Sequence, residues 1–376
     1  MTRVAVLHNT LDFQGGADVV CLSVCAALQR DYEVTLFTLS ETDPGALAER
    51  FDIDLDPSKL AVRPKIGAET VGRLLSSTTP IVGPQLPFRS VLLREVFERY
   101  ADRYDLAVST ANELSVSLPS VQYVHYPQYN RHRLQDAGAD ATDGVLHRVW
   151  SRLAAPSRAE VETSVSLLAN SGWTADVVEE AYGVEPAVVH PPIDPIEGGP
   201  SWEAREDGVV VVGRIAPDKR LLNAIEIVEG VRDRGHDLHV HIVGGAPRAY
   251  RDYVEQVESA AEERSYVFVE RDVPRARIEE LLLNHRYGLN CKPKEHFGMS
   301  VAEYVAAGMV AFAPDSGGQR EILAGRDDRL FDSTSAAVDR LAVAMENGDR
   351  PELAPDRFST DRFEDSIRRA VQRRVV

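Results

Sequence analysis

Two glutamates flank a glycine-containing turn in the segment Lys292-Pro-Lys-Glu-His-Phe-Gly-Met-Ser-Val-Ala-Glu303. Glu295 precedes Phe297-Gly298 and Glu303 follows it, at the expected start of a helix. The first N–H groups of a helix have no partner within the helix and carry partial positive charge, so they attract phosphate or sugar oxygens. The two carboxylates could accept hydrogen bonds from hydroxyls beside them. We therefore expect a ligand with several hydroxyls and a phosphate.

The same residues also fit a purely local role. Ser300-Val-Ala-Glu303 is a capping-box pattern, in which Ser300 would be the N-cap and Glu303 would reach back to its amide. Taken alone, the segment favours neither interpretation.

A second group of charged residues follows the apolar run Val209–Val212. A run of this kind that ends at a glycine predicts a buried parallel strand, and Asp218-Lys219 opens the next helical pattern. Arg214 and Lys219 would then share the edge at which doubly wound sheets bind ligands. Two cations at that edge fit a diphosphate.

Both groups of motifs resemble those of the retaining GT-B glycosyltransferases, specifically glycosyltransferase family 4 (group 1), whose signature is a Glu, seven residues and a Glu. The matching segments are Gly213-Arg-Ile-(three residues)-Lys219, Glu295-His-Phe-Gly298, Glu303-(four residues)-Gly308 and Gly317-Gly318-Gln-Arg-Glu321-Ile322. Gln122-Tyr-Val-His125-Tyr-Pro127 and Asn170-Ser-Gly-Trp173-Thr174 look like segments of the mannosyltransferases that extend dolichol-linked oligosaccharides. The resemblance spans nearly the whole chain.

The resemblance implies a role for each site residue. Glu303 would bind the ribose hydroxyls of the donor, and Glu295 would contact hydroxyls of the transferred sugar. His125, which from its strand alone would be a packed core residue, would contact the donor sugar. Arg214 and Lys219 would hold the diphosphate and stabilise the charge that develops on the departing phosphate without a metal ion. The predicted catalytic residues are therefore Glu295, Arg214, Lys219 and His125, whereas Glu303 belongs to the donor-binding set and no metal ligand is expected.

Further donor contacts are expected from backbone amides. Gly15 and Gly16 follow the first strand and precede a helix, where glycine lets the backbone approach a bound group closely. Phe297, Gly298, Met299 and Ser300 complete the predicted donor-binding set. Asn170 to Thr174 would approach the acceptor or the transferred sugar, although Thr174 also fits a plain helix N-cap.

The predicted activity is the transfer of a hexose, mannose by resemblance, from a GDP- or UDP-linked donor without any cofactor. The acceptor would be a hydroxyl of a glycan or of a polyprenyl- or dolichol-linked lipid. Retention of configuration implies a front-face reaction, in which a donor phosphate oxygen takes the acceptor proton. A double displacement would need a carboxylate nucleophile beneath the sugar, and the sequence offers no convincing candidate.

Other classes of function stay open. Asp52-Ile-Asp54 resembles the acidic motif of metal-dependent transferases, which hold the diphosphate with a divalent cation. A non-enzymatic nucleotide-sugar-binding protein is a further alternative, which the presence of all four expected polar site residues disfavours. His239 and His241 lie on one face of a strand, but the sequence reveals no third ligand, so we interpret them as ordinary sheet residues.

Composition narrows the remaining choices. The 376-residue chain exceeds what one core usually supports, and its net charge of -17 argues against nucleic acid as a partner. Among 42 basic residues the only lysines are Lys59, Lys65, Lys219, Lys292 and Lys294. An acidic surface poor in lysine favours the hypothesis of a halophilic source, and a codon bias toward arginine is the alternative explanation. Three cysteines without a disulfide framework indicate a reducing, cytoplasmic location.

Alternating strands and helices predict an α/β fold with two doubly wound Rossmann-like domains that face a central cleft, the GT-B arrangement. Expected strands are 3–9, 33–39, 106–110, 121–126, 166–170, 187–190, 208–215, 238–243, 266–270, 287–291 and 310–313. Expected helices are 17–29, 88–102, 174–182, 219–233, 250–263, 275–284, 299–307 and a charged helix after Pro355. The proline-rich segment that begins at Pro191 marks the domain boundary.

The predicted domains are 1–192 on the acceptor side, a linker at 193–207, a nucleotide-sugar-binding domain at 208–355, and a helix at 356–376 that crosses back to the first domain. No stretch reaches the roughly 20 apolar residues of a spanning helix. Residues 71–100 could form an amphipathic surface in peripheral contact with the inner face of the cell membrane. A loop and a helix packed on the first sheet would explain them equally well.

Overall fold

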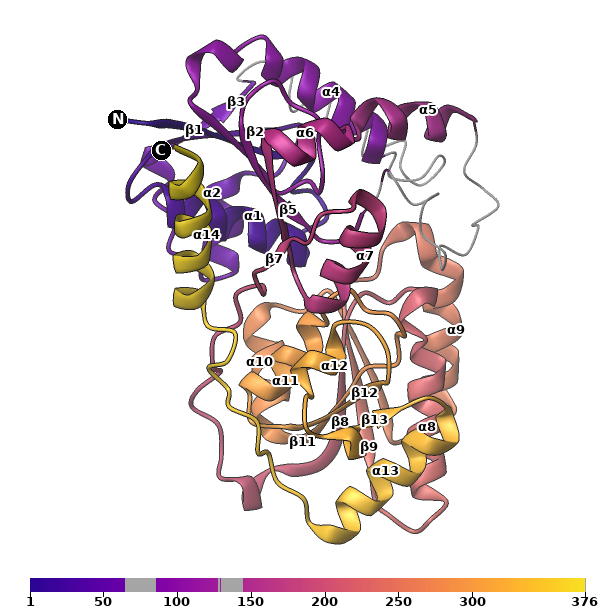
Figure 1. Cartoon of the computed structure of the whole chain (residues 1–376). Helices are drawn as coiled ribbons and strands as arrows, with labels where there is room; N and C mark the ends of the chain where they lie inside the picture. Colours follow the sequence, from indigo (N-terminus) through magenta and orange to yellow (C-terminus); the bar gives the residue numbers. More distant parts are fainter. Residues whose placement is uncertain (65–85, 128, 130–144, 376) are drawn as a thin grey trace. The chain divides into compact units, whose positions relative to one another are not determined.

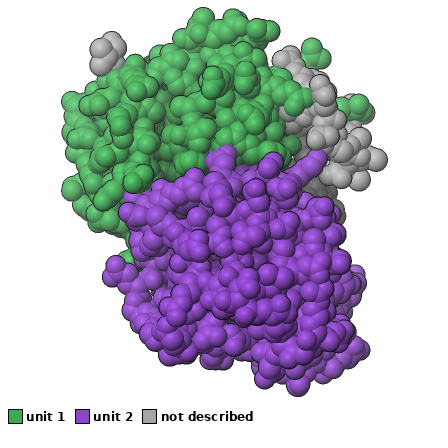
Figure 2. All heavy atoms as spheres, turned by 60° about the horizontal axis from the view of Figure 1, so that its bottom comes forward, with its two compact units in different colours: residues 1–192, 360–376 green, residues 193–359 purple. Residues whose placement is uncertain are grey.

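The protein consists of two compact units, which Figure 2 colours separately. The computed structural model describes residues 1–64, 86–127, 129 and 145–375. Unit 1 comprises Met1–Pro192 and Thr360–Val376, and unit 2 comprises Ile193–Ser359. The chain therefore leaves unit 1, builds unit 2 and returns to unit 1 for its last helix.

Unit 1 is built on a parallel sheet with the strand order β3-β2-β1-β4-β5-β6-β7 (Figure 1). Its strands are β1 (Arg3–His8), β2 (Glu33–Thr38), β3 (Leu60–Arg63), β4 (Leu106–Ser109), β5 (Ser120–Val124), β6 (Val165–Ala169) and β7 (Ala187–Val188). Both faces of the sheet carry a core: Val4 and Val6 of β1 lie in one cluster, and Ala5 and Leu7 lie in the other. Burial on both faces explains the continuous apolar run of this strand.

Seven helices flank this sheet in the described part of unit 1. They are α1 (Gly16–Leu28), α2 (Pro44–Arg50), α4 (Leu86–Glu98), α5 (Val145–Ala154), α6 (Arg158–Thr163), α7 (Gly172–Tyr182) and α14 (Thr360–Val375). Helix α14 contributes Phe363 and Ile367 to the same core cluster as α1. Its Arg374 donates hydrogen bonds to the Ser166 hydroxyl at 2.6 Å and the Val165 carbonyl at 2.9 Å.

Unit 2 repeats this architecture with the strand order β10-β9-β8-β11-β12-β13. The strands are β8 (Glu206–Val212), β9 (His239–Gly244), β10 (Val267–Arg271), β11 (His285–Leu289), β12 (Val310–Pro314) and β13 (Leu330–Phe331). The first strand of the unit, β8, lies between β9 and β11, so the strand order reverses beside it. Ligands of doubly wound sheets bind at such a reversal, outside the carboxyl ends of the strands.

The helices of unit 2 cover both faces of its sheet. They are α8 (Leu221–Arg232), α9 (Arg251–Glu262), α10 (Arg275–Asn284), α11 (Met299–Ala306), α12 (Gln319–Ile322) and α13 (Thr334–Asn347). Helices α8, α9 and α13 pack on one core cluster, and α10, α11 and α12 pack on the other. Both units therefore have Rossmann-like topology, which confirms the predicted α/β fold class.

Several helices begin one or two residues from the predicted position, and for α7 and α8 the structure shows the physical reason. Helix α8 starts at Leu221 and not at Lys219, because Arg220 adopts a left-handed conformation after the short 3₁₀ turn η5 (Pro217–Lys219). Helix α7 has Ser171 as its N-cap, and the Ser171 hydroxyl accepts a hydrogen bond from the Thr174 amide at 3.0 Å. The interpretation of Thr174 as an N-cap is therefore wrong.

The segment predicted as a linker, residues 193–207, packs as part of unit 2. The Ile193 amide donates to the Phe358 carbonyl at 2.7 Å, and the Ile196 amide donates to the Ala306 carbonyl at 3.0 Å. The side chain of Ile193 is buried in the core beside α11. These contacts hold the segment to the body of unit 2.

Only part of the amphipathic surface predicted for residues 71–100 can be placed, because residues 71–85 lie outside the described residues. Helix α4 buries Leu93 and Phe97 in the core of unit 1, and the Phe88 ring meets the Trp150 ring edge-on at 5.1 Å. This helix therefore packs on the first sheet. Within the described residues, none of the helices combines the length and the apolar character needed to cross a membrane.

Candidate active site

The loops that follow β8 and β11 meet at the point where the strand order of unit 2 reverses. Lys219 follows β8 and Glu295 follows β11, and the Lys219 Nζ lies 2.9 Å from the Glu295 Oε2. Both side chains are only 16% exposed. The structure thus brings together two of the residues predicted to act on the donor.

This ion pair belongs to a larger charged network. Lys292 Nζ lies 3.6 Å from Glu295 Oε2 and 3.2 Å from Asp218 Oδ2, and Arg214 Nη2 lies 3.7 Å from Asp218 Oδ2. We call these five residues, Arg214, Asp218, Lys219, Lys292 and Glu295, the charge network. Three cations and two carboxylates leave one net positive charge, which suits an anionic ligand.

The cations of the network set the ionisation of Glu295. Burial opposes the charged form of this carboxyl, but Lys219 and Lys292 outweigh burial and hold the pKa of Glu295 below its usual range. Glu295 is therefore ionised near neutral pH and can accept hydrogen bonds from hydroxyls.

A buried glutamine fixes the loop that carries Lys292 and Glu295. The Gln319 side-chain amide donates to the carbonyls of Lys292, Pro314 and Ser316 at 3.2, 3.1 and 3.0 Å, and its oxygen accepts from Asn290 at 2.7 Å. Gln319 is fully buried. It thereby ties the loop after β11 to the loop after β12 and acts as a positioning residue for the network.

The start of α11 lies on the same segment as Glu295. Gly298 is its N-cap, with φ at 105°, and within the described residues no side chain caps the helix. Ser300 lies inside the first turn, so the capping-box interpretation of Ser300 and Glu303 is wrong. The first amides of the helix, at Met299 and Ser300, can therefore donate hydrogen bonds to an anion at its N-terminal end.

Glu303 has another partner than the capping box predicts. The Arg275 guanidinium, at the first position of α10, forms a short ion pair with the Glu303 carboxylate and a 2.8 Å hydrogen bond with Glu279. The charge of Glu303 raises the pKa of Arg275 above its usual range. Arg275 is a functional candidate that sequence reasoning missed, because the adjacency of β8 and β11 that brings α10 beside α11 is not visible in local patterns.

The side chain of Phe297 belongs to the core. It is 2% exposed and meets the Phe358 ring edge-on at 5.2 Å. Any contact of Phe297 with a donor would therefore involve its backbone, whereas the burial of its ring anchors the turn before Gly298.

Unit 1 carries the remaining predicted residues at the carboxyl ends of its strands. Gly15 is the N-cap of α1 just after β1, its amide donates to Asp18 at 3.0 Å, and Gly16 is the first helical residue. His125 directly follows β5. Its amide donates to Asn112 Oδ1 at 2.7 Å and its carbonyl accepts from Asn170 at 3.1 Å.

The alternative metal motif lies at the other edge of the same sheet. Asp52 and Asp54 precede β3 and so stand on the amino-end side, whereas Gly15 and His125 follow their strands. The Asp54 side chain is 95% exposed and lies 3.7 Å from Arg30. This position separates the pair from the residues predicted to bind the donor.

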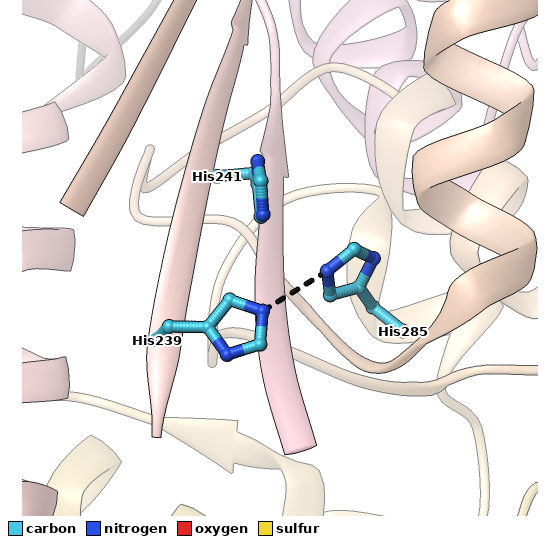
Figure 3. A group of neighbouring side chains, drawn as sticks. All are labelled: His239, His241 and His285. Atoms are coloured by element: carbon cyan, nitrogen blue, oxygen red, sulfur yellow. Dashed lines mark hydrogen bonds between the residues drawn. The ribbon is translucent and has the colours of Figure 1, made fainter. Parts of the chain in front are cut away.

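The expectation that His239 and His241 have no third potential metal ligand beside them is wrong. His239 and His241 of β9 have a third imidazole beside them, because His285 at the start of β11 reaches toward the same point (Figure 3). Glycine at position 208 of the intervening β8 leaves room for the rings, since a Cβ there would lie 2.4 Å from His239 Nε2.

Comparison with known proteins shows that most of unit 2 is similar to glycosyltransferases. Residues 199–354 match the family described as glycosyl transferases group 1. Three relatives carry the name GDP-Man:Man(3)GlcNAc(2)-PP-Dol alpha-1,2-mannosyltransferase. They come from Dictyostelium discoideum (24% identity, 53% of this chain and 44% of that one), Candida glabrata (24%, 72% and 59%) and Neurospora crassa (25%, 58% and 47%). The chain spans about half the length of these relatives.

Solved structures share the fold over the whole chain. Anabaena Alr3699/HepE in complex with UDP and glucose has a TM-score of 0.68 at 15% identity, covering 99% of this chain and 100% of that one. WaaG, a glycosyltransferase involved in lipopolysaccharide biosynthesis, has a TM-score of 0.65 at 15% identity, covering 99% and 95%. The chain thus shares its fold with solved glycosyltransferase structures, and residues 199–354 match the family described as glycosyl transferases group 1.

Proposed function

We propose that this protein is a retaining glycosyltransferase that moves a hexose, mannose in the first instance, from a nucleotide diphosphate sugar to a hydroxyl of a lipid-linked glycan. The charge network at the carboxyl ends of β8 and β11 carries this proposal. It combines cations that can bind a diphosphate with an ionised carboxylate that can bind sugar hydroxyls. A surface that bound only a phosphate, or only a sugar, would not need both.

Transfer breaks the bond between the anomeric carbon and the donor phosphate oxygen, and the bonding electron pair leaves with the nucleotide diphosphate. Arg214, Lys219 and Lys292 would stabilise the negative charge that builds on this leaving group, together with the first amides of α11. The acceptor oxygen forms the new bond on the same face of the sugar. Its proton passes to a phosphate oxygen of the departing diphosphate.

The carboxylates would position the donor. Glu295, ionised and held by two lysines, would accept hydrogen bonds from hydroxyls of the transferred sugar, and Glu303, oriented by Arg275, would accept them from the ribose. The donor contacts predicted for His125, Gly15 and Gly16 remain part of the proposal; because the Gly15 amide already donates to Asp18, Gly15 would act by letting the backbone approach a bound group closely. In this mechanism the side chains and amides neutralise the diphosphate, so metal independence is part of the proposal.

The names of the relatives support GDP-mannose as donor and a glycan on a dolichol-type diphosphate as acceptor. We place the reaction in the cytoplasm, with the lipid-linked acceptor presented at the inner face of a membrane. The chain's excess of acidic residues further supports a salt-adapted protein, for which activity should rise with salt concentration.

A thermal-shift panel of the full chain with GDP, UDP, GDP-mannose and UDP-glucose tests the donor. A ligand that binds the folded state raises the melting temperature in proportion to ln(1 + [ligand]/Kd), and we expect the largest shift with GDP or GDP-mannose. Incubation with GDP-mannose and a short polyprenyl-diphosphate glycan should then release GDP and extend the glycan. Binding without release of GDP under these conditions would contradict the enzymatic proposal and favour a nucleotide-sugar-binding protein.

A further inference from the structure

Three imidazoles converge on the amino-end side of the sheet of unit 2, away from the charge network. His239 and His241 lie on β9 and His285 begins β11, and one ring nitrogen of each lies within 4.8 Å of the other two (Figure 3). The Nε2 atoms of His239 and His285 are 3.1 Å apart. In a tetrahedral site with Zn–N bonds of about 2.0–2.1 Å, two nitrogen ligands lie about 3.3 Å apart, so this pair already has the required separation.

Two of the rings are held in the tautomer that a metal ion needs. The Leu281 carbonyl can only accept, so its 2.7 Å contact with His285 Nδ1 places the proton on that atom and the lone pair on Nε2. His241 Nδ1 lies 2.9 Å from the Glu270 carboxylate, which likewise leaves the lone pair on His241 Nε2. A carbonyl or carboxylate that holds the far nitrogen is the usual outer partner of a metal-bound histidine.

The surroundings keep the imidazoles neutral and leave space between them. Burial is the main reason that the pKa values of His239, His241 and His285 all lie below the usual histidine value. Neutral imidazole is the form that ligates metals. Gly208 of β8 lies under the rings, and any side chain there would collide with His239 and His285.

We propose that His239, His241 and His285 form a binding site for a divalent transition-metal ion, with Zn²⁺ as the preferred occupant. Imidazole ligands suit Zn²⁺, Ni²⁺, Cu²⁺ and Co²⁺, and a compact three-histidine set with one further ligand is typical of Zn²⁺. Glu206 Oε2, 3.6 Å from His239 Nε2, is placed to supply that further ligand, or water can do so. In the metal-bound form the His239 proton moves to Nδ1, so no net proton is lost.

The position of the site points to a structural role. The three histidines stand at the beginnings of β9 and β11, whereas Lys219 and Glu295 follow the ends of β8 and β11. An ion here would clamp β9 and β11 together across β8. Occupancy would stabilise the folded state through mass action without taking part in glycosyl transfer.

The test uses the full chain, expressed without a histidine tag and treated with a chelator. Titration with ZnCl₂, followed by gel filtration and metal analysis, should give about one equivalent of Zn²⁺ per chain and a raised melting temperature. Co²⁺ should give the visible absorption bands of a tetrahedral site. Wild-type protein that retains no stoichiometric Zn²⁺ would overturn the proposal.

Variants separate this site from adventitious binding. The double variant His239→Gln/His241→Gln should lose stoichiometric binding, whereas His236→Gln, a control from outside the cluster, should keep it. Glu270→Gln keeps all three ligands but removes the carboxylate that orients His241, so it should weaken Zn²⁺ binding about 10–100-fold. Gly208→Ala should also weaken Zn²⁺ binding, because the added methyl group would push the rings apart. Far-UV circular dichroism confirms folding of each variant. The proposal would also be overturned if Glu270→Gln and the double variant both bound Zn²⁺ with the affinity of the wild type.

Discussion

The ammonium of Lys219 lies 2.9 Å from the carboxylate of Glu295, although the two residues follow different strands of the sheet. The ion pair exists because β8 and β11 are neighbours, and because Gln319 holds the loop that follows β11. A donor diphosphate would meet this pair already assembled, so little reorganisation would be needed in the reaction.

Replacement of Lys219 by methionine should lower turnover about 10²–10³-fold, the usual effect of removing one preorganised group that stabilises transition-state charge. The free energy of unfolding should fall by about 1–3 kcal/mol, because Glu295 loses its nearest cation and keeps the more distant Lys292 Nζ at 3.6 Å. Single-turnover kinetics and urea unfolding measure the two effects. Lys59→Met, at a side chain that is 67% exposed, is the matched control and should change stability by less than about 0.5 kcal/mol. Equal turnover in both variants would contradict the proposed role.

The ionisation of Glu295 predicts a pH-dependent contribution to stability. Its pKa is held below the usual value in the folded state, mainly by Lys219 and Lys292 against the effect of burial. The unfolded chain therefore binds this proton more readily, and the contribution is complete above about pH 4.3 and is lost as the pH falls through the folded-state pKa. Urea unfolding of the wild type and of Glu295→Gln between about pH 3 and 7 should show a difference that shrinks on the acid side. A difference that grows toward low pH would have the wrong sign.

Gln319→Leu should disturb the site without touching the donor. The change leaves three backbone carbonyls without their amide donor, and we expect a loss of about 2–4 kcal/mol in the free energy of unfolding. Because Lys292 lies on the loop that Gln319 holds, kcat should also fall. The control is Gln372→Leu on α14, where the replaced side chain is exposed. Unfolding curves and kcat are the measurements. Full stability in Gln319→Leu would show that the loop does not depend on this amide.

Arg275→Leu should weaken donor binding more than it slows the chemical step. Arg275 orients Glu303, and loss of a hydrogen bond to a charged group costs about 1.5–3 kcal/mol. The KM for the donor should therefore rise about tenfold or more, with kcat within about threefold of the wild type. The control is Arg234→Leu, which removes an exposed ion pair with Asp339. A fall in kcat at unchanged KM would assign Arg275 to the reaction itself.

The acidic motif before β3 should be dispensable. Asp52→Asn/Asp54→Asn changes exposed groups at the amino-end side of the first sheet, so turnover should stay within about twofold of the wild type. A chelator should likewise leave turnover at 25 °C unchanged, while it lowers the melting temperature if the histidine site is occupied. Loss of turnover in chelator that Mg²⁺ or Mn²⁺ restores would instead support a metal-dependent transferase.

Local patterns were sufficient for most of the buried strands and for the α/β class. Val209–Val212 ends at Gly213, and Val4–Leu7 is apolar throughout, because both runs are covered on two faces. The same signals marked the helix start at Arg275, where Pro274 is the N-cap. Wherever one strand or helix carries its own hydrophobic pattern, its existence could be predicted from the residues alone.

Two helices that were not predicted, α2 and α13, have recognisable start signals in the sequence. Helix α13 is capped by Ser333 at its start, and Gly348 ends it in a left-handed conformation. Asp43 and Pro44 likewise mark the start of α2. Charged segments flank both helices and make these regions resemble loops, although Ala337, Val338 and Leu341 give α13 a buried apolar face.

Pairings between distant segments could not be predicted, because they depend on the strand order. Arg275 meets Glu303 and His285 meets His239 only when β11 is placed beside β8. The local hint for the histidine cluster is Gly208, which lies inside β8 between Asp207 and the apolar run Val209–Val212; a glycine within a strand often marks close approach of other groups. Without the sheet order, that glycine has no visible partner.

The hydrogen bond between Ile193 and Phe358 closes unit 2 on itself, since it joins the first and the penultimate residue of that unit. During synthesis on the ribosome, residues 193–359 emerge complete while the first unit still lacks α14 and the side chains of Phe363, Ile367 and Val371 that fill its core. Unit 2 can therefore fold first, whereas the core of unit 1 is completed only once α14 has been synthesised.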